Sequence, residues 1–382
     1  MNQHTDDLYP LRFREILRNY GFGDRWIVDA FAKEGLPEDH RIAETWEVCD
    51  RPGESSHVIN GPLQGRSLHQ LIEEYGEQLL GREIVARFGT RFPLLIKFLD
   101  ASNPLGEQVH QDDALARKQG LDDPGKTEAW VMLRARKGAT IHCGNRSGTN
   151  REQVLQALID GTIREQMQEH TVAPGDAFLL YAGTMHYSRG GVLFYEIMQN
   201  SDVIIGLRPW RPIASDEERV RWARSALEGI HIEEGFDCRT TPVWLREGDN
   251  RHSCLLACEH FAVERLDLVT PLTIRCTGER FYVLSQVDGT STLKHNRHEE
   301  RLRPGMSCLL PADLGSVIVE PEGEVSLLMA YVPDLVQQII DPLRAVGVPD
   351  AAIAALGGKT TLNPLPALLK STPSNPSQKE AT

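Results

Sequence analysis

Two segments of the chain carry one pattern, and this repeat limits what the chain can fold into. Gly175–His186 (GDAFLLYAGTMH) and Gly305–Ser316 (GMSCLLPADLGS) each begin with glycine and pass through apolar residues into a turn of small residues. A short apolar run followed by such a turn is typical of a β-strand that enters a hairpin. We therefore expect two similar β-rich units. Only the first copy ends in a histidine.

The composition narrows the class of protein. With 382 residues, 41% of them hydrophobic, the chain can fill the cores of two or three domains. Its net charge of −13 argues against binding to nucleic acid or to an anionic membrane, because phosphate recognition needs clustered Lys and Arg. There is no long apolar run and no leader pattern, so we expect no membrane span. The seven cysteines show no disulfide-like spacing, which predicts reduced cysteines and a cytoplasmic protein. The oligomeric state is left open.

Helical and extended patterns alternate along the chain. The linker between the two β-rich units begins with Ser215 and Glu218, the spacing of a capping box. Helical patterns are expected at 67–80, 150–168, 215–229 and 334–355, and strands over 107–199 and 254–332. This order predicts a mainly β protein, with duplicated antiparallel jelly-roll barrels and additional helical segments.

His186 is a candidate metal ligand, and further donors lie upstream of it. Gln108 and His110 are two residues apart, so on a strand both side chains project to the same face. Glu128 begins the apolar segment EAWVML. Singly, these residues are more often surface polar groups or satisfied histidines. Together, two imidazoles, a carboxylate and an amide oxygen form a donor set suited to zinc or another divalent first-row metal.

Several segments, in order, resemble one enzyme family. FPLLIKFLDA, EQVHQDDALA, GKTEAW, YAGTMH and YEIMQNSD look like type I mannose-6-phosphate isomerases, zinc enzymes of the cupin fold. The similarity runs from about Arg41 to Trp210 and continues more weakly in FYVLSQVDG, LRPGMSCLLPADLG and LLMAYVPD. The resemblance implies that the zinc ligands are Gln108, His110, Glu128 and His186. It also implies that the second barrel carries no metal, so that Ser316 replaces the histidine without loss.

The expected units follow from these patterns. An N-terminal mixed α/β part completes the first barrel, and a C-terminal helix precedes a disordered tail rich in Pro, Ser and Thr. The boundaries are 1–105 for the N-terminal part, 106–212 for the metal-binding cupin core, 213–250 for a helical linker, 251–335 for a cupin-like barrel without metal, and 336–382 for the C-terminal helix and tail.

The resemblance implies an aldose–ketose isomerase that acts on a small sugar or sugar phosphate, here mannose 6-phosphate and fructose 6-phosphate or a related pair. Such an enzyme moves a proton between C1 and C2 through an enediol, so an acid/base group must lie near that edge of the sugar. Lys126, beside Glu128, and Asp202, in QNSD, are the candidates. The plainer interpretations are a surface lysine and a turn-capping aspartate.

The sequence departs from the family at two positions linked with the phosphate group. Gly206 stands where the family has an arginine, and Gly106 stands where it has a serine. A phosphate dianion normally needs Arg, Lys, Ser or backbone amides around it. Arg208, or else Arg211, is the candidate that supplies the missing charge.

These departures keep three alternatives open. The first is an isomerase for an unphosphorylated sugar. The second is an iron oxygenase, because two histidines and one carboxylate can form a facial triad. The third is a sugar-binding or regulatory protein that retains the metal without turnover.

Overall fold

Two apolar segments of the sequence become the central strands of the first barrel. β6 (Leu94–Ala101) and β13 (Val192–Gln199) are buried along their whole length and pair antiparallel over all eight residues. One face of these strands lines the barrel interior and the other packs on the second barrel, so most side chains on both faces are apolar. The computed structural model describes residues 8–31, 40–247 and 249–372.

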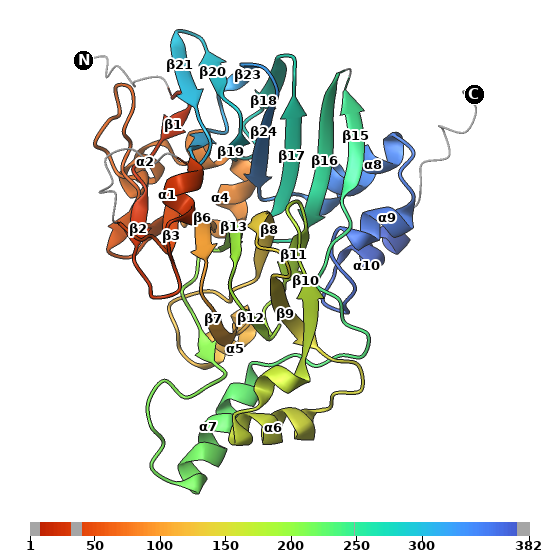
Figure 1. Cartoon of the computed structure of the whole chain (residues 1–382). Helices are drawn as coiled ribbons and strands as arrows, with labels where there is room; N and C mark the ends of the chain where they lie inside the picture. Colours follow the sequence, from red (N-terminus) through yellow and green to blue (C-terminus); the bar gives the residue numbers. More distant parts are fainter. Residues whose placement is uncertain (1–7, 32–39, 248, 373–382) are drawn as a thin grey trace.

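Each barrel consists of two antiparallel sheets (Figure 1). In the first barrel, one sheet has the order β11 (Ala177–Leu180), β8 (Glu128–Ala135), β13, β6, β3 (Glu44–Val48) and β2 (Ile16–Arg18). The other has the order β10 (Met167–Thr171), β9 (Thr140–Asn145), β12 (His186–Ser188), β7 (Leu105–Val109) and β14 (Ile205–Gly206). A small hairpin joins β4 (Asp50–Arg51) and β5 (Glu54–Ser55).

The second barrel repeats the two-sheet arrangement and borrows one N-terminal strand. Its larger sheet has the order β1 (Leu11–Arg12), β22 (Ser307–Leu310), β19 (Tyr282–Asp288), β24 (Val325–Tyr331), β17 (Ala262–Leu268), β16 (Asn250–Ala257) and β15 (Val243–Glu247). Its smaller sheet has the order β18 (Leu272–Cys276), β23 (Gly315–Pro321), β20 (Ser291–His295) and β21 (His298–Leu302). The repeated sequence pattern forms β11 and β12 in one barrel and β22 and β23 in the other, as expected for a duplicated jelly roll.

Helices cover the edges of the barrels (Figure 1). On the N-terminal side lie α1 (Trp26–Phe31), α2 (Leu68–Tyr75), α3 (Glu77–Leu80) and α4 (Arg82–Phe88). Around the first barrel lie α5 (Asp113–Lys118), α6 (Arg151–Asp160), the 3-10 helix η1 (Ile163–Gln166) and α7 (Asp216–Glu228). At the C-terminal end lie the π-helix η2 (Leu335–Ile340), α8 (Asp341–Ala345), α9 (Asp350–Ala355) and α10 (Leu365–Ser371).

The helices expected from the sequence are present but are more broken than predicted. The helix expected at 67–80 is interrupted at Gly76, whose φ of 44° belongs to the left-handed side of the map. At α7, Ser215 accepts from the Glu218 N–H, but the Glu218 carboxylate accepts from the Ala214 N–H, so only half of the capping box forms. The expected disordered tail lies outside the described residues, apart from Ser371 and Thr372 at the end of α10. The unit boundaries stay predictions.

The structure corrects the expectation of unpaired cysteines. Cys143 of β9 and Cys238, which are 95 residues apart, form a disulfide inside the first barrel. The spacing of these two cysteines in the sequence could not predict the disulfide, because they become neighbours only when the barrel folds. In the described ranges, no helix is long and apolar enough to cross a membrane. The cytoplasmic location stays a prediction.

The two barrels share one apolar core. The outer faces of the two large sheets pack together with α2, α3 and α4, and Phe92 and Phe281 lie at this junction with ring centroids 4.9 Å apart. Gly81, between α3 and α4, has a φ of 99°, and a side chain there would collide with the backbone of Glu279. Packing of the second barrel therefore fixes the helices that lie beside the first.

This shared core predicts the effect of one truncation. Phe281→Ala removes a fully buried ring at the junction, and we expect it to lower the free energy of unfolding by about 3–5 kcal/mol. Ile318→Ala, at a position that is 42% exposed on the second barrel, should change it by less than about 0.5 kcal/mol. Urea denaturation followed by circular dichroism compares the two. Equal midpoints would contradict the shared core.

Candidate metal centre

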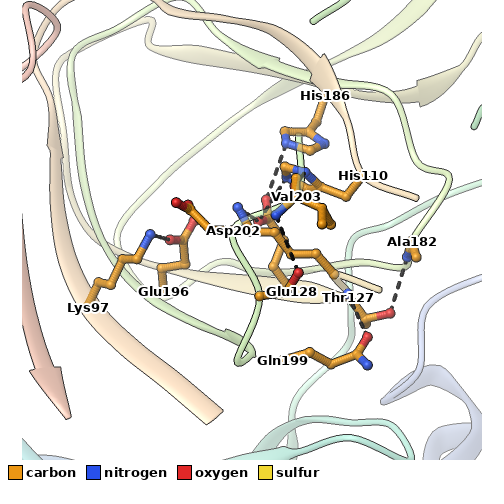
Figure 2. A network of polar contacts seen from close by, with 12 residues as sticks. Lys97, His110, Thr127, Glu128, Ala182, His186, Glu196, Gln199, Asp202 and Val203 are labelled. Atoms are coloured by element: carbon orange, nitrogen blue, oxygen red, sulfur yellow. Dashed lines mark hydrogen bonds and ion pairs between the residues drawn. The ribbon is translucent and has the colours of Figure 1, made fainter. Parts of the chain in front are cut away.

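Three of the predicted ligands converge between the two sheets of the first barrel (Figure 2). His110 directly follows β7, Glu128 begins β8 and His186 begins β12. One ligand atom from each lies within 4.8 Å of the other two, and each residue is at most 2% exposed. Gln108 lies opposite His186 in the pairing of β7 with β12. Residues directly opposite in an antiparallel pair point to the same face, so Gln108 and His186 share one face of their sheet.

Backbone carbonyls fix the orientation of both imidazoles. His110 Nδ1 lies 2.8 Å from the carbonyl oxygen of Val203, and His186 Nδ1 lies 2.9 Å from that of Thr184. Because a carbonyl oxygen only accepts, Nδ1 carries the hydrogen in each ring. Each Nε2 therefore presents its lone pair toward Glu128, which is the arrangement that metal-binding histidines adopt.

The atoms that face one another lack hydrogen-bond partners. Within the described residues, neither Nε2 of His110 and His186 nor either carboxylate oxygen of Glu128 has one. The Nε2 atoms lie 3.2 and 3.3 Å from the carboxylate oxygens. Four unsatisfied polar atoms in one buried place would be costly unless a cation satisfied them together. These residues therefore fit a divalent metal ion.

Electrostatics keeps the donors in the protonation states that a metal requires. Burial lowers the pKa of His110 to about 3 and also lowers the pKa of His186, which favours the neutral imidazole in both residues. The short contacts with Glu128 are therefore not ion pairs. Burial opposes ionisation of Glu128, but the charge of Lys126 and the contacts with His110 and His186 together outweigh burial and hold the pKa of the carboxyl well below its usual range.

The three predicted catalytic residues have different positions. Lys126 is buried, with Nζ 3.4 Å from the Glu128 carboxylate. Asp202 is exposed and immediately precedes Val203, whose carbonyl orients His110. Arg208 Nε lies 3.0 Å from the Glu107 carboxylate. Because Glu107 alternates with Gln108 along β7, it points away from the metal face. The structure thus brings Lys126, but not Arg208, to the cluster.

A row of buried residues beside the cluster was not predicted from the sequence. Trp130, Glu196, Lys97 and Trp46 are cross-strand neighbours on β8, β13, β6 and β3. Lys97 Nζ lies 3.2 Å from the Glu196 carboxylate (Figure 2). It also lies 3.3 Å from the Glu44 carboxylate. Each carboxylate also accepts from an indole N–H, at 2.9 Å from Trp130 and 2.7 Å from Trp46. Burial by itself lowers the pKa of Lys97, but the two carboxylates outweigh burial, and the net effect is a raised pKa.

One signal in the sequence could have found this row. A lysine within the apolar run LLIKFL and a glutamate within LFYEIM are unusual, because a charge buried in a strand needs a partner. Which strands are neighbours is not readable from a single sequence.

A cavity of about 1050 Å³ lies elsewhere, against the β4–β5 hairpin, α4 and α5. Its wall includes Asp50, Arg51 and Gln199, but none of the predicted metal ligands. Gln199 separates it from the cluster, since its side-chain oxygen accepts from the Thr127 N–H at 2.9 Å. We therefore place the reactive site by its donor chemistry and not by the size of the cavity.

A second set of donors, His170, Asp237 and Cys238, also converges. Cys238 is bonded to Cys143, so it has no thiolate to offer a metal in this structure.

The two glycines at the departures from the family differ in their surroundings. A Cβ on Gly106 would meet open space. A Cβ on Gly206 would lie less than 3.0 Å from the indole nitrogen of Trp210, so this ring occupies the space next to Gly206.

Comparisons with known proteins agree with the fold and with the family that the sequence resembles. Residues 11–132 match the family model for the type I phosphomannose isomerase catalytic domain, and residues 252–332 match the mannose-6-phosphate isomerase cupin domain. The mannose-6-phosphate isomerase ManA of Bacillus subtilis is 29% identical over 316 residues, which span 82% of this chain and 97% of the relative. The probable mannose-6-phosphate isomerase GmuF of the same organism is 28% identical, over 82% of this chain and 96% of the relative.

Solved structures share the architecture. The crystal structure of the mannose 6-phosphate isomerase from Bacillus subtilis superposes with a TM-score of 0.72 at 23% identity, covering 85% of this chain and 99% of that one. A putative mannosephosphate isomerase from Archaeoglobus fulgidus gives a TM-score of 0.68 at 23% identity, covering 86% and 99%. At this level of identity the likeness concerns the fold.

The convergence of donors predicts the effect of removing one. His186→Ala should abolish most metal binding, because it takes away one of the ligands held between the sheets. His142→Ala, on the neighbouring strand and opposite Tyr187 in register, should retain the metal. Ser316→Ala in the second barrel should also retain it. Metal per chain is measured by inductively coupled plasma mass spectrometry after dialysis, and full metal content in His186→Ala would refute the ligand set.

The Lys97 ion pairs predict a destabilisation that depends on pH. Lys97→Met leaves two carboxylates buried without their cation, and we expect it to cost about 3–5 kcal/mol near neutral pH. Burial already raises the pKa of Glu196 in the folded protein. Without Lys97, the pKa of Glu196 in the folded protein rises further above its value in the unfolded chain. The loss of stability caused by Lys97→Met therefore grows as the pH rises and shrinks as the pH falls.

Urea midpoints at pH 5 and pH 8 measure this dependence. The decrease in urea midpoint of Lys97→Met relative to the unmodified protein should be smaller at pH 5 than at pH 8. Lys294→Met, which removes a partly exposed ion pair with Glu320, should show a small deficit at both pH values. A deficit of Lys97→Met that is equal at both would mean that the buried carboxylates are not its cause.

Proposed function

Because the chain belongs to the type I phosphomannose isomerase family, we propose that it is a metal-dependent aldose–ketose isomerase that interconverts mannose 6-phosphate and fructose 6-phosphate. The observation that carries this proposal is the set of buried, unsatisfied donor atoms of His110, Glu128 and His186. The family match supports the type of reaction, and the unsatisfied donor atoms support the choice of these residues as its site.

Zinc is the ion that we propose for this site, with Gln108, His110, Glu128 and His186 as its ligands. Their N and O donors suit zinc, although another divalent first-row ion would be accepted by the same set. When bound, the ion supplies a Lewis acid that stabilises negative charge developing on the sugar oxygens.

The residues around the ligands handle protons and orientation. Lys126 is held next to Glu128, where its ammonium group can donate a hydrogen bond or a proton to a sugar oxygen as the enediol forms. Asp202 stands at the exposed edge of the same site and is the second candidate for proton transfer. The buried ion pairs of Lys97 with Glu44 and Glu196 hold a fixed charge pattern behind the substrate.

The contacts of Arg208 and Trp210 favour a second class of substrate, an unphosphorylated sugar. Arg208 is engaged by Glu107, and Trp210 rather than a cation occupies the space beside Gly206. Both contacts reduce the positive charge available to a phosphate group. An unphosphorylated aldose, such as free mannose, is therefore the alternative substrate.

Proton NMR of the zinc-loaded protein with mannose 6-phosphate in deuterated buffer tests the proposal. We expect fructose 6-phosphate to appear, with deuterium exchange at the carbon that loses its proton. Lys126→Met, prepared in the same way, should retain its metal and lose at least about 100-fold in rate, the usual contribution of a general acid or base.

The same assay is repeated with free mannose. Turnover of mannose alone would reassign the substrate to the unphosphorylated sugar. Absence of turnover with either sugar, with metal confirmed in the site, would contradict an isomerase and favour a protein that binds a sugar without converting it.

A further inference from the structure

Trp210 occupies an unusual position beside the metal centre. Gly206 of β14 lies opposite Gln108 of β7 in an antiparallel pair. Directly opposite residues point to the same face, so a side chain on Gly206 would project to the face that carries the metal ligands. The indole nitrogen of Trp210 lies less than 3.0 Å from where that side chain would begin. The indole ring therefore lies on the metal side of this strand pair.

The neighbouring residues support this placement. Val109 of β7 and Leu207, which directly follows β14, belong to the apolar core beneath α6 and α7, on the opposite face of this strand pair. Because side chains alternate along a strand, Gln108 and Gly206 cannot share that core. The face that Trp210 contacts is thus the one that opens toward the metal ligands.

The ring itself is left in water. Trp210 is 78% exposed, whereas Trp46 and Trp130, beside the same site, are 4% and 0% exposed. A large aromatic ring that contributes so little to a core is poorly explained by stability. Pro209 and Pro212 flank it in the sequence and restrict the backbone around it. The ring is therefore presented on a stiffened segment, which lowers the entropy lost when a ligand packs on it.

We propose that Trp210 is a substrate-contacting residue whose indole packs against the apolar C–H face of a sugar ring at the mouth of the metal centre. The inference rests on the proposed function for the identity of the sugar. An exposed indole offers a flat apolar surface and one N–H donor, the combination with which binding sites hold a ligand of mixed polarity. It recognises the sugar ring and not a charge, so it serves phosphorylated and unphosphorylated sugars alike.

Steady-state kinetics of metal-loaded variants test this role. Trp210→Ala should raise KM for the sugar that is turned over by about five- to tenfold and change kcat by less than about threefold, because stacking stabilises bound substrate and transition state alike. Trp210→Phe keeps a ring and should return KM to within about threefold of the original. Trp244→Ala removes an exposed tryptophan of the second barrel, 56% exposed, and should leave both constants unchanged.

A second variant leaves the indole in the chain but moves it. Gly206→Ala places a methyl group where the ring now lies, so it should raise KM as Trp210→Ala does, with metal content unchanged. A rise in KM for Trp210→Ala alone, with Gly206→Ala unaffected, would overturn the geometry on which the inference stands.

Tryptophan fluorescence provides a readout independent of turnover. Titration with mannose 6-phosphate, and separately with mannose, should change the emission of the unmodified protein and of Trp244→Ala but not of Trp210→Phe. If neither sugar is converted, the proposed isomerase activity fails, while loss of this emission change in Trp210→Phe still supports contact with the sugar. An unaltered KM in Trp210→Ala, or an emission change that persists in Trp210→Phe, would overturn the inference.

Discussion

The first barrel is organised around a buried carboxylate. Glu128 is 1% exposed, and neither of its oxygens has a hydrogen-bond partner among the described residues. An ionised group in such a place is expensive unless cations and donors surround it. Lys126 lies on one side, and two imidazoles, each fixed by a backbone carbonyl, present Nε2 on the other. This arrangement depends on the position of β7, on the start of β12 and on the small turn that precedes β12.

The second barrel has the same architecture but, in the part of the chain that the structure describes, no buried carboxylate at the corresponding place. The turn that places His186 in the first barrel places Ser316 at the start of β23 in the second, and apolar side chains fill the second barrel's interior. Its larger sheet packs against the outer face of the first barrel, and β1 crosses from the N-terminal part to complete that sheet. The second copy thus supports the wall from which Lys97 and Glu196 face the metal centre.

Much of this could be predicted from the sequence. The repeat and the alternating strands predicted a duplicated jelly roll, and the donor types of His110, Glu128 and His186, together with the family resemblance, predicted that they would meet. The Lys97–Glu196 pair, the Cys143–Cys238 disulfide and the contact of Trp210 with Gly206 were missed for one physical reason. Each depends on which strands or loops become neighbours, and local sequence patterns do not encode the order of strands in a sheet.

We propose that a single divalent ion held by the first barrel carries the chemistry, and an anomalous difference map at the zinc absorption edge tests this proposal. Crystals grown with zinc should show one strong peak among Gln108, His110, Glu128 and His186, and none beside Ser316. A peak beside Ser316, or none among the four residues of the first barrel, would contradict this account.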